Sequence, residues 1–238
     1  MHSPVRNLIP IETLLLAYRS GIFPMADTRE DQDVFWVEPR DRAIIPLDGL
    51  RVSKSLRKVL RSERFTITIN QAFEEVVHAC AAPRPGHPES WISDRIVRSY
   101  TELHRAGHAH SLECWQADNI SETPKLVGGL YGVSFDSVFC GESMFSRADN
   151  ASKVALCWLV ALMRIAGFKL LDCQFMTDHL ASMGAEELPQ SEYLKLVAKA
   201  NGKTALTLPQ AHARVLAQAA TGDYSPGQLI AQSLTQTS

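Results

Sequence analysis

The chain has 238 residues, of which 45% are hydrophobic and 21% are charged, and its formal net charge is −2. This composition is typical of a globular protein, and no uninterrupted run of about 18 apolar residues is present that could cross a membrane. The five cysteines are widely spaced without a Cys-x-x-Cys pair, and the N-terminus carries no apolar export leader. We therefore expect a cytoplasmic protein with reduced thiols.

The first 45 residues predict a small N-terminal α/β domain. Residues Ile11–Arg19 have helical periodicity and are followed by Ser20-Gly21, which favours a helix end. The proline in Ile22-Phe23-Pro24 predicts a rigid apolar turn. The other predicted elements are short strands at residues 34–37 and 43–45, separated by a charged loop.

A basic segment follows this predicted domain. Residues 51–64 contain six basic side chains and one acidic side chain. If Ser53 caps a helix here, four basic residues recur at helical spacing on one face, namely Lys54, Arg57, Lys58 and Arg61. Such a helix is commonly a solvated surface element. The alternative is a ridge that binds nucleic-acid phosphates.

The middle of the chain predicts alternating strands and helices. A strand at 65–69 precedes a helix from Asn70 to about Cys80, and Ser93 is predicted to cap a helix through Ala106. Proline-rich residues 81–89 predict an exposed loop. The later elements are strands at 110–116, 126–133 and 138–142 with a polar hairpin loop at 118–125, a buried helix at 151–166, a strand at 169–174, a short helix ending near Gly184 and a helix at 189–200.

This order of elements favours an α+β fold. Three strands, a buried helix, a strand and another helix match the core of the acetyltransferase-like (GNAT, acyl-CoA N-acyltransferase-like) fold, although other α+β domains share the order. We predict a GNAT-like catalytic domain over residues 46–202. From Lys203 onward the sequence is polar and rich in alanine and glutamine, so we expect the C-terminal tail, 203–238, to be partly ordered.

Two predicted strands carry polar residues where a buried sheet is usually apolar. The two-residue period of a strand puts Asp172 and Gln174 on one face. Glu142 stands at the end of another apolar run, directly after Gly141. Buried polar groups of this kind need partners. They form either a polar network that fixes the register of the sheet or a functional site at the strand ends.

Other patterns argue against several common sites. In Gly141-Glu142-Ser143-Met144-Phe145 a phenylalanine replaces the last glycine of a nucleophile elbow. His108 and His110 have no further ligand at useful spacing, so no metal is expected. The turn Ser146–Asn150 lacks the glycines that would cradle the pyrophosphate of an acyl-CoA. No cofactor is therefore predicted.

Several segments resemble the leucyl/phenylalanyl-tRNA–protein transferases, in order from about residue 12 to residue 200. The most specific are Cys140-Gly141-Glu142-Ser143-Met144-Phe145-Ser146-Arg147 and Asp172-Cys173-Gln174. The resemblance is also carried by Tyr18–Pro24, Trp36–Ala43, Gly107–Ser111, Gly128–Gly132 and Asn150–Lys153.

The resemblance implies an aminoacyltransferase without a metal or CoA. Such an enzyme moves Leu or Phe, and Met less well, from aminoacyl-tRNA to proteins with N-terminal Arg or Lys and marks them for degradation. The implied catalytic residues are Asp172, Gln174 and Glu142. The implied tRNA-binding residues are Lys54, Lys58, Arg61, Trp91 and Tyr100. The implied pocket for the amino-acid side chain consists of Phe139, Met144, Leu156 and Leu171.

The reaction would be aminolysis of the ester that joins the amino acid to the tRNA. In our hypothesis Gln174, held by Asp172, accepts a hydrogen bond from the attacking amine, while Glu142 attracts the cationic acceptor residue. A proton relay through the ribose 2′-hydroxyl is the alternative. Two other functions remain open from the residues alone, an acyl-CoA-dependent N-acetyltransferase and a non-catalytic tRNA-binding module.

Overall fold

The computed structural model describes residues 8–31, 33–83, 89–118 and 123–235. The first seven residues, and the centres of the predicted loops at 81–89 and 118–125, lie outside the described residues. Within the described part of the chain, no helix is both long and apolar enough to cross a membrane.

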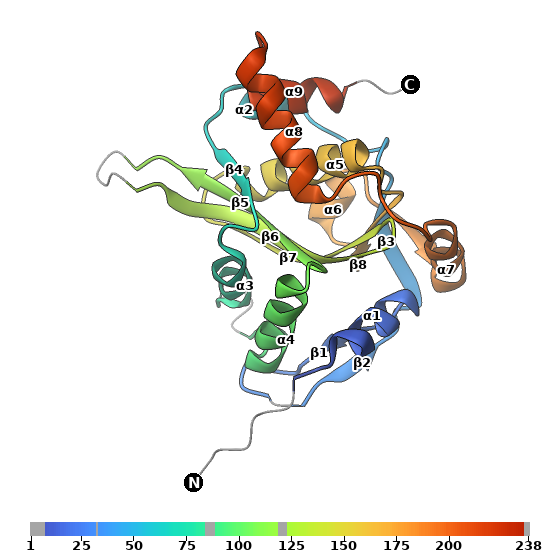
Figure 1. Cartoon of the computed structure of the whole chain (residues 1–238). Coiled ribbons are helices and arrows are strands. Elements are labelled where there is room, and N and C mark those ends of the chain that lie inside the picture. Colours follow the sequence, from blue (N-terminus) through green and yellow to red (C-terminus); the bar gives the residue numbers. More distant parts are fainter. Residues whose placement is uncertain (1–7, 32, 84–88, 119–122, 236–238) are drawn as a thin grey trace.

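A seven-stranded mixed sheet forms the centre of the molecule (Figure 1). Its strand order is β4-β5-β6-β7-β8-β3-β9, and β7 and β8 are its parallel neighbours, whereas the other neighbours are antiparallel. The fold is therefore mixed α/β. The strands are β3 (Asp41–Ile45), β4 (Thr66–Ile69), β5 (Ala109–Gln116), β6 (Lys125–Phe135), β7 (Val138–Ser146), β8 (Leu170–Gln174) and β9 (Glu186–Pro189).

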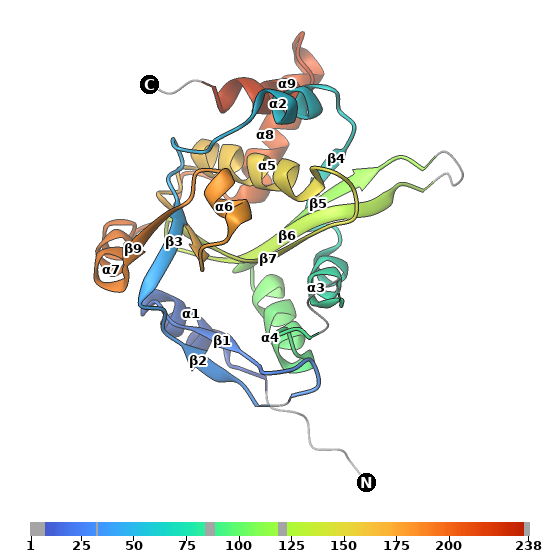
Figure 2. The same cartoon turned by 180° about the vertical axis from the view of Figure 1, so that it is seen from behind.

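Helices cover both faces of this sheet (Figures 1 and 2). One face packs against the apolar helix α5 (Ala151–Ala166), and beyond it lie α2 (Lys54–Arg61), α8 (Leu208–Thr221) and α9 (Pro226–Ser233). The short helix α6 (Asp178–Ser182) lies on the same side. The other face is covered by α1 (Ile11–Arg19), α3 (Phe73–Ala81), α4 (Asp94–Arg105) and α7 (Gln190–Lys199). A separate two-stranded sheet of β1 (Phe23–Met25) and β2 (Phe35–Val37) lies beside α1.

Helix α5 is buried along almost its whole length, as its apolar sequence predicts. It lies directly against β6, because a Cβ atom at Gly128 would be only 2.5 Å from the Cβ of Ala151. The helix ends at Gly167, whose left-handed φ of 86° is a conformation that glycine adopts without strain. Gly128 therefore allows α5 to pack closely on the sheet.

Three local predictions are wrong, and one strand was not predicted. Residues Phe23–Met25, predicted as a turn, form a strand that pairs with β2. Strand β3, assigned above to the N-terminal segment, belongs to the large sheet and pairs with β8 and β9. Strand β9 was not predicted. Asn70 does not cap α3; its side chain instead accepts a hydrogen bond from the backbone of Ser111 at 3.0 Å.

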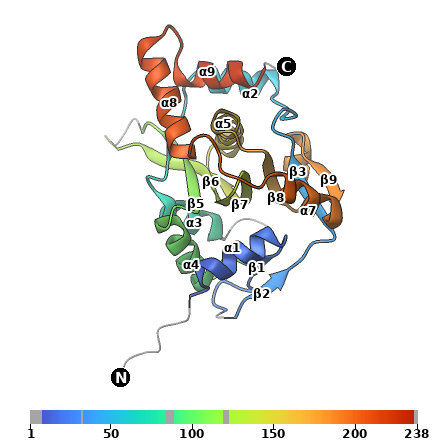
Figure 3. The ribbon, with the colours of Figure 1, turned by 45° about the vertical axis from the view of Figure 1, so that its right-hand side comes forward.

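The expectation of a partly ordered C-terminal tail is also wrong for residues 208–233. Helices α8 and α9 each begin with a capping box, formed by Thr207 with Gln210 and by Ser225 with Gln228. Both helices contribute buried apolar residues to the core around α5. Figure 3 shows α9 lying against the basic helix α2, so the end of the chain supports an element near its beginning.

Candidate active site

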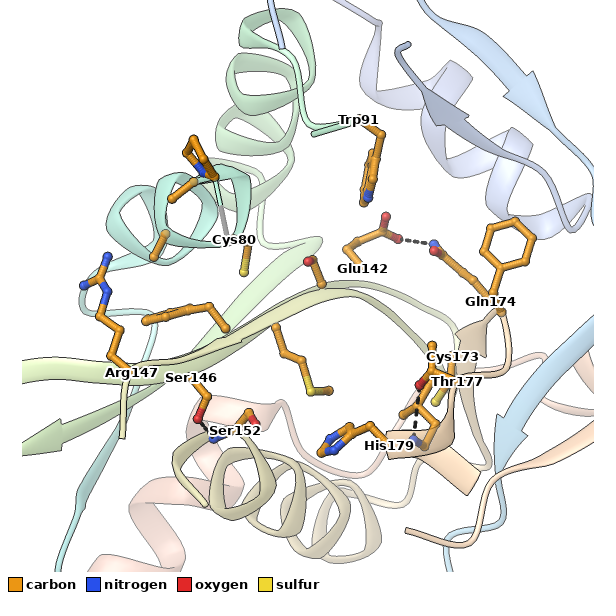
Figure 4. Close-up of a pocket in the computed structure, with 18 of the residues that line it drawn as sticks. Cys80, Trp91, Glu142, Ser146, Arg147, Ser152, Cys173, Gln174, Thr177 and His179 are labelled. Atoms are coloured by element: carbon orange, nitrogen blue, oxygen red, sulfur yellow. Dashed lines mark hydrogen bonds between the residues drawn. The ribbon is translucent and has the colours of Figure 1, made fainter. Parts of the chain in front are cut away.

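Strands β7 and β8 separate partway along their length. They pair from Val138 and Leu170 to Cys140 and Asp172, and β7 then continues to Ser146 paired with β6 but not with β8. A cavity of about 800 Å³ lies where they diverge, and Glu142 and Gln174 line it (Figure 4). The parallel strands therefore bring together the two most specific motifs of the sequence.

Glu142 is buried and hydrogen-bonded by three side chains. The Tyr18 hydroxyl donates to Oε1 at 2.7 Å, and the Tyr100 hydroxyl donates to Oε2 at 3.3 Å. Gln174 Nε2 donates to Oε1 at 3.0 Å. Burial raises the pKa of Glu142 from 4.5 to about 7, although the hydrogen bonds from Tyr18 and Gln174 lower it. The carboxyl group can therefore change its charge near neutral pH.

Gln174 ends β8 in an unusual backbone conformation. Its φ is 63°, in the left-handed region that non-glycine residues rarely adopt. Its backbone N–H donates to Asp172 Oδ1 at 2.8 Å, which supports this conformation. Because its side-chain nitrogen faces Glu142, its carbonyl oxygen remains available as an acceptor.

Asp172 lies behind the cavity wall and does not line it. Its carboxylate is fully buried and receives Arg42 Nε at 2.8 Å on Oδ1 and Arg42 Nη2 at 2.6 Å on Oδ2. The Tyr193 hydroxyl donates to Oδ2 at 3.2 Å. The predicted link between Asp172 and Gln174 is present, but it reaches the backbone of Gln174 and not its side chain. Asp172 thus has no free face for a substrate.

The two aromatic residues that were expected to contact tRNA occupy different environments. Trp91 is half-buried and lines the cavity, so part of its side chain is accessible from the cavity. Tyr100 is fully buried, packs edge-on against Tyr131 and bonds to Glu142. Tyr100, expected to bind tRNA, is therefore not accessible for a direct contact with it and instead supports Glu142.

A smaller apolar cavity of about 90 Å³ adjoins the larger one. Both cavities are lined by Glu142, Met144 and Leu180, and the smaller one is also lined by Leu156 and Leu171. Phe139, expected in this pocket, is fully buried and lines neither cavity, because its ring packs over Gly132. Three of the four expected pocket residues are therefore adjacent.

The basic helix has the predicted orientation. Ser53 caps α2 and accepts a hydrogen bond from Leu56 N at 3.1 Å. Lys54, Lys58 and Arg61 are exposed, whereas Leu56 and Leu60 are buried against the core. The three cations therefore face solvent, on the side of the sheet that carries α5 and α6.

Sequence reasoning missed three supporting side chains, Arg42, Tyr18 and Tyr193. Arg42 was assigned to a charged loop, and the two tyrosines lie on helices far from the site in sequence. The available signal was Arg42 itself, directly before the apolar run of β3, where a buried cation needs an acid. Among the described residues, no three His, Cys, Asp or Glu side chains converge in a way that could hold a metal ion.

Comparison with known proteins assigns this site to a transferase class. The family model described as leucyl/phenylalanyl-tRNA protein transferase matches residues 44–198, and the model of the N-terminal domain of that family matches residues 8–40. The chain therefore belongs to the leucyl/phenylalanyl-tRNA protein transferase family.

Individual relatives agree with this assignment. A leucyl/phenylalanyl-tRNA–protein transferase of Novosphingobium aromaticivorans is 54% identical, with 98% of each chain covered. One from Rhizorhabdus wittichii is 54% identical over 82% of this chain and 76% of its own. Among solved structures, FemX has a TM-score of 0.50 at 11% identity, covering 75% of this chain and 66% of that one. The similarity to FemX is one of fold alone.

Proposed function

We propose that the chain transfers Leu or Phe, and Met less well, from aminoacyl-tRNA to the α-amine of proteins that begin with Arg or Lys. The observation that carries the proposal is the Glu142–Gln174 pair at the wall of a cavity that adjoins an apolar one. Family membership supports aminoacyl-tRNA as the donor and a protein as the acceptor. The transfer would mark the acceptor protein for degradation in the cytoplasm.

The proposed reaction is aminolysis of an ester. The nitrogen of the acceptor α-amine attacks the carbonyl carbon of the aminoacyl ester, an amide bond forms, and the 3′-oxygen of the terminal ribose leaves. The amine loses one proton and the leaving oxygen gains one, so the reaction is balanced without a cofactor. Holding the two substrates face to face supplies much of the rate enhancement.

Gln174 and Glu142 are proposed to act on the attacking amine. An α-amine with a pKa of about 8 is largely protonated at pH 7, so the reaction needs its neutral form held near the ester. The carbonyl oxygen of Gln174 accepts a hydrogen bond from this amine and orients its lone pair. The carboxylate of Glu142 favours the approach of a cationic N-terminal residue, and its pKa near 7 suits proton exchange at neutral pH. The ribose 2′-hydroxyl remains an alternative route for the proton.

The small apolar cavity is the proposed site of the transferred side chain. Met144, Leu156 and Leu171 offer an apolar surface in this cavity, which Glu142 and Ser143 also line. Leu, Phe and Met would gain by burial there, whereas a charged side chain would lose its hydration. This is the physical basis of the proposed amino-acid preference.

We propose that the tRNA binds across α2 and that its 3′-terminal nucleotide lies in the large cavity. Lys54, Lys58 and Arg61 would contact backbone phosphates, and Trp91 would stack on the terminal nucleotide. The order of β5, β6, β7, the buried helix α5 and β8 also supports a GNAT-like core. We propose that this core forms the catalytic domain and that the N-terminal segment is a smaller domain beside it.

A transfer assay tests the proposal. The chain is incubated with a peptide that begins with Arg and with either labelled Phe-tRNA or labelled acetyl-CoA. We expect label on the peptide from Phe-tRNA, and no label when the peptide's α-amine is blocked. Labelling from acetyl-CoA alone would favour an N-acetyltransferase, and tight tRNA binding without any product would favour a binding module.

A further inference from the structure

Arg42 lies in the protein interior, on the far side of Asp172 from the cavity, and it is fully buried. We propose that Arg42 is a positioning residue for aminoacyl transfer, which acts through Asp172 to hold Gln174 against Glu142. The inference rests on the proposed function, because it concerns how the reacting groups of that site are held.

The guanidinium group of Arg42 is fixed on every side. Two of its nitrogens donate to Asp172, and Nη1 donates to the carbonyl oxygen of Gly21 at 2.9 Å. The ring centroids of Phe23 and Tyr193 lie 4.9 and 4.5 Å from its central carbon. These contacts join β3 to β8, to the turn before β1 and to α7, so one side chain sets the position of four elements.

Asp172 passes this constraint to the cavity wall. Oδ1 receives both Arg42 Nε and the backbone N–H of Gln174, so the two donors share one oxygen atom. The carboxylate can hold the Gln174 backbone only in the orientation that Arg42 imposes on it. Asp172 is fully buried and does not line the cavity, so its hydrogen-bonded connection to the cavity wall is the one to the backbone N–H of Gln174.

The backbone of Gln174 needs such a constraint. A φ of 63° is a sparsely populated conformation for a residue with a Cβ atom, and it persists only where the surroundings impose it. The neighbouring Phe175 is held in turn by an edge-on contact with Phe23, the ring that lies over Arg42. Arg42 therefore supports two consecutive residues of the cavity wall.

Lysine cannot replace this arrangement. A single ammonium group cannot donate two parallel hydrogen bonds to a carboxylate and a third to Gly21 from fixed positions. In Arg42→Lys the carboxylate of Asp172 keeps a nearby cation but loses its orientation, so Gln174 is held less firmly. Because the positive charge is retained, this variant tests the orientation of the Asp172 carboxylate separately from the charge beside it.

The experiment measures steady-state transfer by Arg42→Lys in the wild-type and Gln174→Ala backgrounds, together with thermal unfolding of each variant. In the wild-type background we expect kcat to fall by about tenfold or more, while KM for Phe-tRNA stays within about threefold. In the Gln174→Ala background the same substitution should change kcat by less than about twofold, because the residue through which Arg42 acts is already absent.

The matched control is Arg19→Lys, because Arg19 also pairs with a carboxylate, Asp136 at 3.1 Å, and lies over a ring, that of Phe135, away from the cavity. Its kcat should equal that of the wild type. If Arg42→Lys does not fold, Tyr193→Phe serves instead, because it removes one hydrogen-bond donor to Asp172 and keeps the aromatic ring. In the wild-type background Tyr193→Phe should lower kcat by less than Arg42→Lys does. In the Gln174→Ala background it should not lower kcat.

The inference is overturned if the folded Arg42→Lys protein has a wild-type kcat, or if its loss of kcat is equally large in the Gln174→Ala background. If Tyr193→Phe is used instead of Arg42→Lys, the inference is overturned by a wild-type kcat or by an equal loss of kcat in the Gln174→Ala background. Transfer by the wild-type protein is measured in the same assay. A wild type that transfers nothing refutes the proposed function, whereas an active wild type with an unaffected variant refutes the role of Arg42 alone.

Discussion

The side-chain amide of Gln174 donates to Glu142 Oε1 at 3.0 Å, across the gap where β7 and β8 have separated (Figure 4). This bond fixes which end of the amide faces the cavity, because the nitrogen is held by Glu142 and the oxygen is left as an acceptor. The charge of Glu142 and the orientation of Gln174 should therefore both affect transfer.

Transfer is expected to depend on the ionisation of Glu142. Its pKa is raised to about 7, chiefly by burial, and the charged or titratable groups that interact with it are Tyr18, Tyr100, Tyr131, Cys140 and Asp172. The carboxyl group is protonated below this pH and ionised above it, so kcat/KM should rise with pH through about 7 if the ionised form is the active one. The pH profile of single-turnover transfer measures this.

In Glu142→Gln the rate should be lower at pH 8, and the rise near pH 7 should be replaced by the later rise that follows deprotonation of the α-amine, whose pKa is about 8. The carboxamide is nearly isosteric: its oxygen can accept the hydrogen bonds from Tyr18 and Gln174, and its NH2 group can donate to the Tyr100 hydroxyl. Thermal unfolding serves as the control for folding. A variant that keeps the wild-type pH profile would refute the role of Glu142.

The apolar cavity is expected to set amino-acid preference. Leu156→Ala enlarges it, so the ratio of Phe to Leu transferred in competition should rise by about tenfold. The matched control is Leu162→Ala, on the same helix and equally buried but outside both cavities. Both variants should lose about 2–5 kcal/mol of stability. Equal shifts in preference for the two variants would disprove the assignment of the pocket.

The basic helix is expected to contribute electrostatically to tRNA binding. Replacing Lys54, Lys58 and Arg61 with Ala should flatten the log–log salt dependence of tRNA binding by roughly two to three units, because each neutralised phosphate contributes about 0.7–0.9 to the slope. Binding of every tRNA should weaken alike, because phosphate contacts do not read sequence. A matched control replaces the exposed Lys195, Lys199 and Lys203. An unchanged salt slope in the α2 variant would mean that tRNA binds elsewhere.

The contact between α9 and α2 is expected to hold that helix in place. A Cβ atom at Gly227 would lie 2.0 Å from the backbone oxygen of Leu60, so Gly227→Ala has to push the two helices apart. We expect a loss of about 1–3 kcal/mol of stability and weaker tRNA binding, with kcat at saturating tRNA unchanged. In the control Gly222→Ala the nearest atom would be 3.1 Å away, so both losses should be smaller. Equal behaviour of the two variants would contradict this role of α9.

The convergence of Glu142, Asp172 and Gln174 could be predicted from the sequence because each interrupts an apolar strand, and buried polar groups need partners. The amphipathic pattern of α2 likewise predicted its cap and its buried face. Both inferences depend on the local sequence pattern around each residue.

The relationships that were missed depend on contacts between distant residues. Arg42 is 130 residues from Asp172, so nothing next to it shows that its partner is an acid in the core. Tyr100 and Phe139 were expected at the substrate, but the sequence does not distinguish an aromatic ring that lines a cavity from one packed directly behind it. The capping boxes at Thr207 and Ser225 were visible locally, yet the polar composition of the segment obscured them.

The most direct test of the account is the single-turnover rate of Phe transfer by Gln174→Ala, with its affinity for Phe-tRNA measured in parallel. Gln174 lines the cavity and orients the amine but does not contribute to tRNA binding. The single-turnover rate should therefore fall by about a hundredfold, while the Kd for Phe-tRNA stays within about threefold of the wild-type value. A Gln174→Ala protein that transfers Phe at the wild-type rate would contradict the assignment of this cavity as the active site.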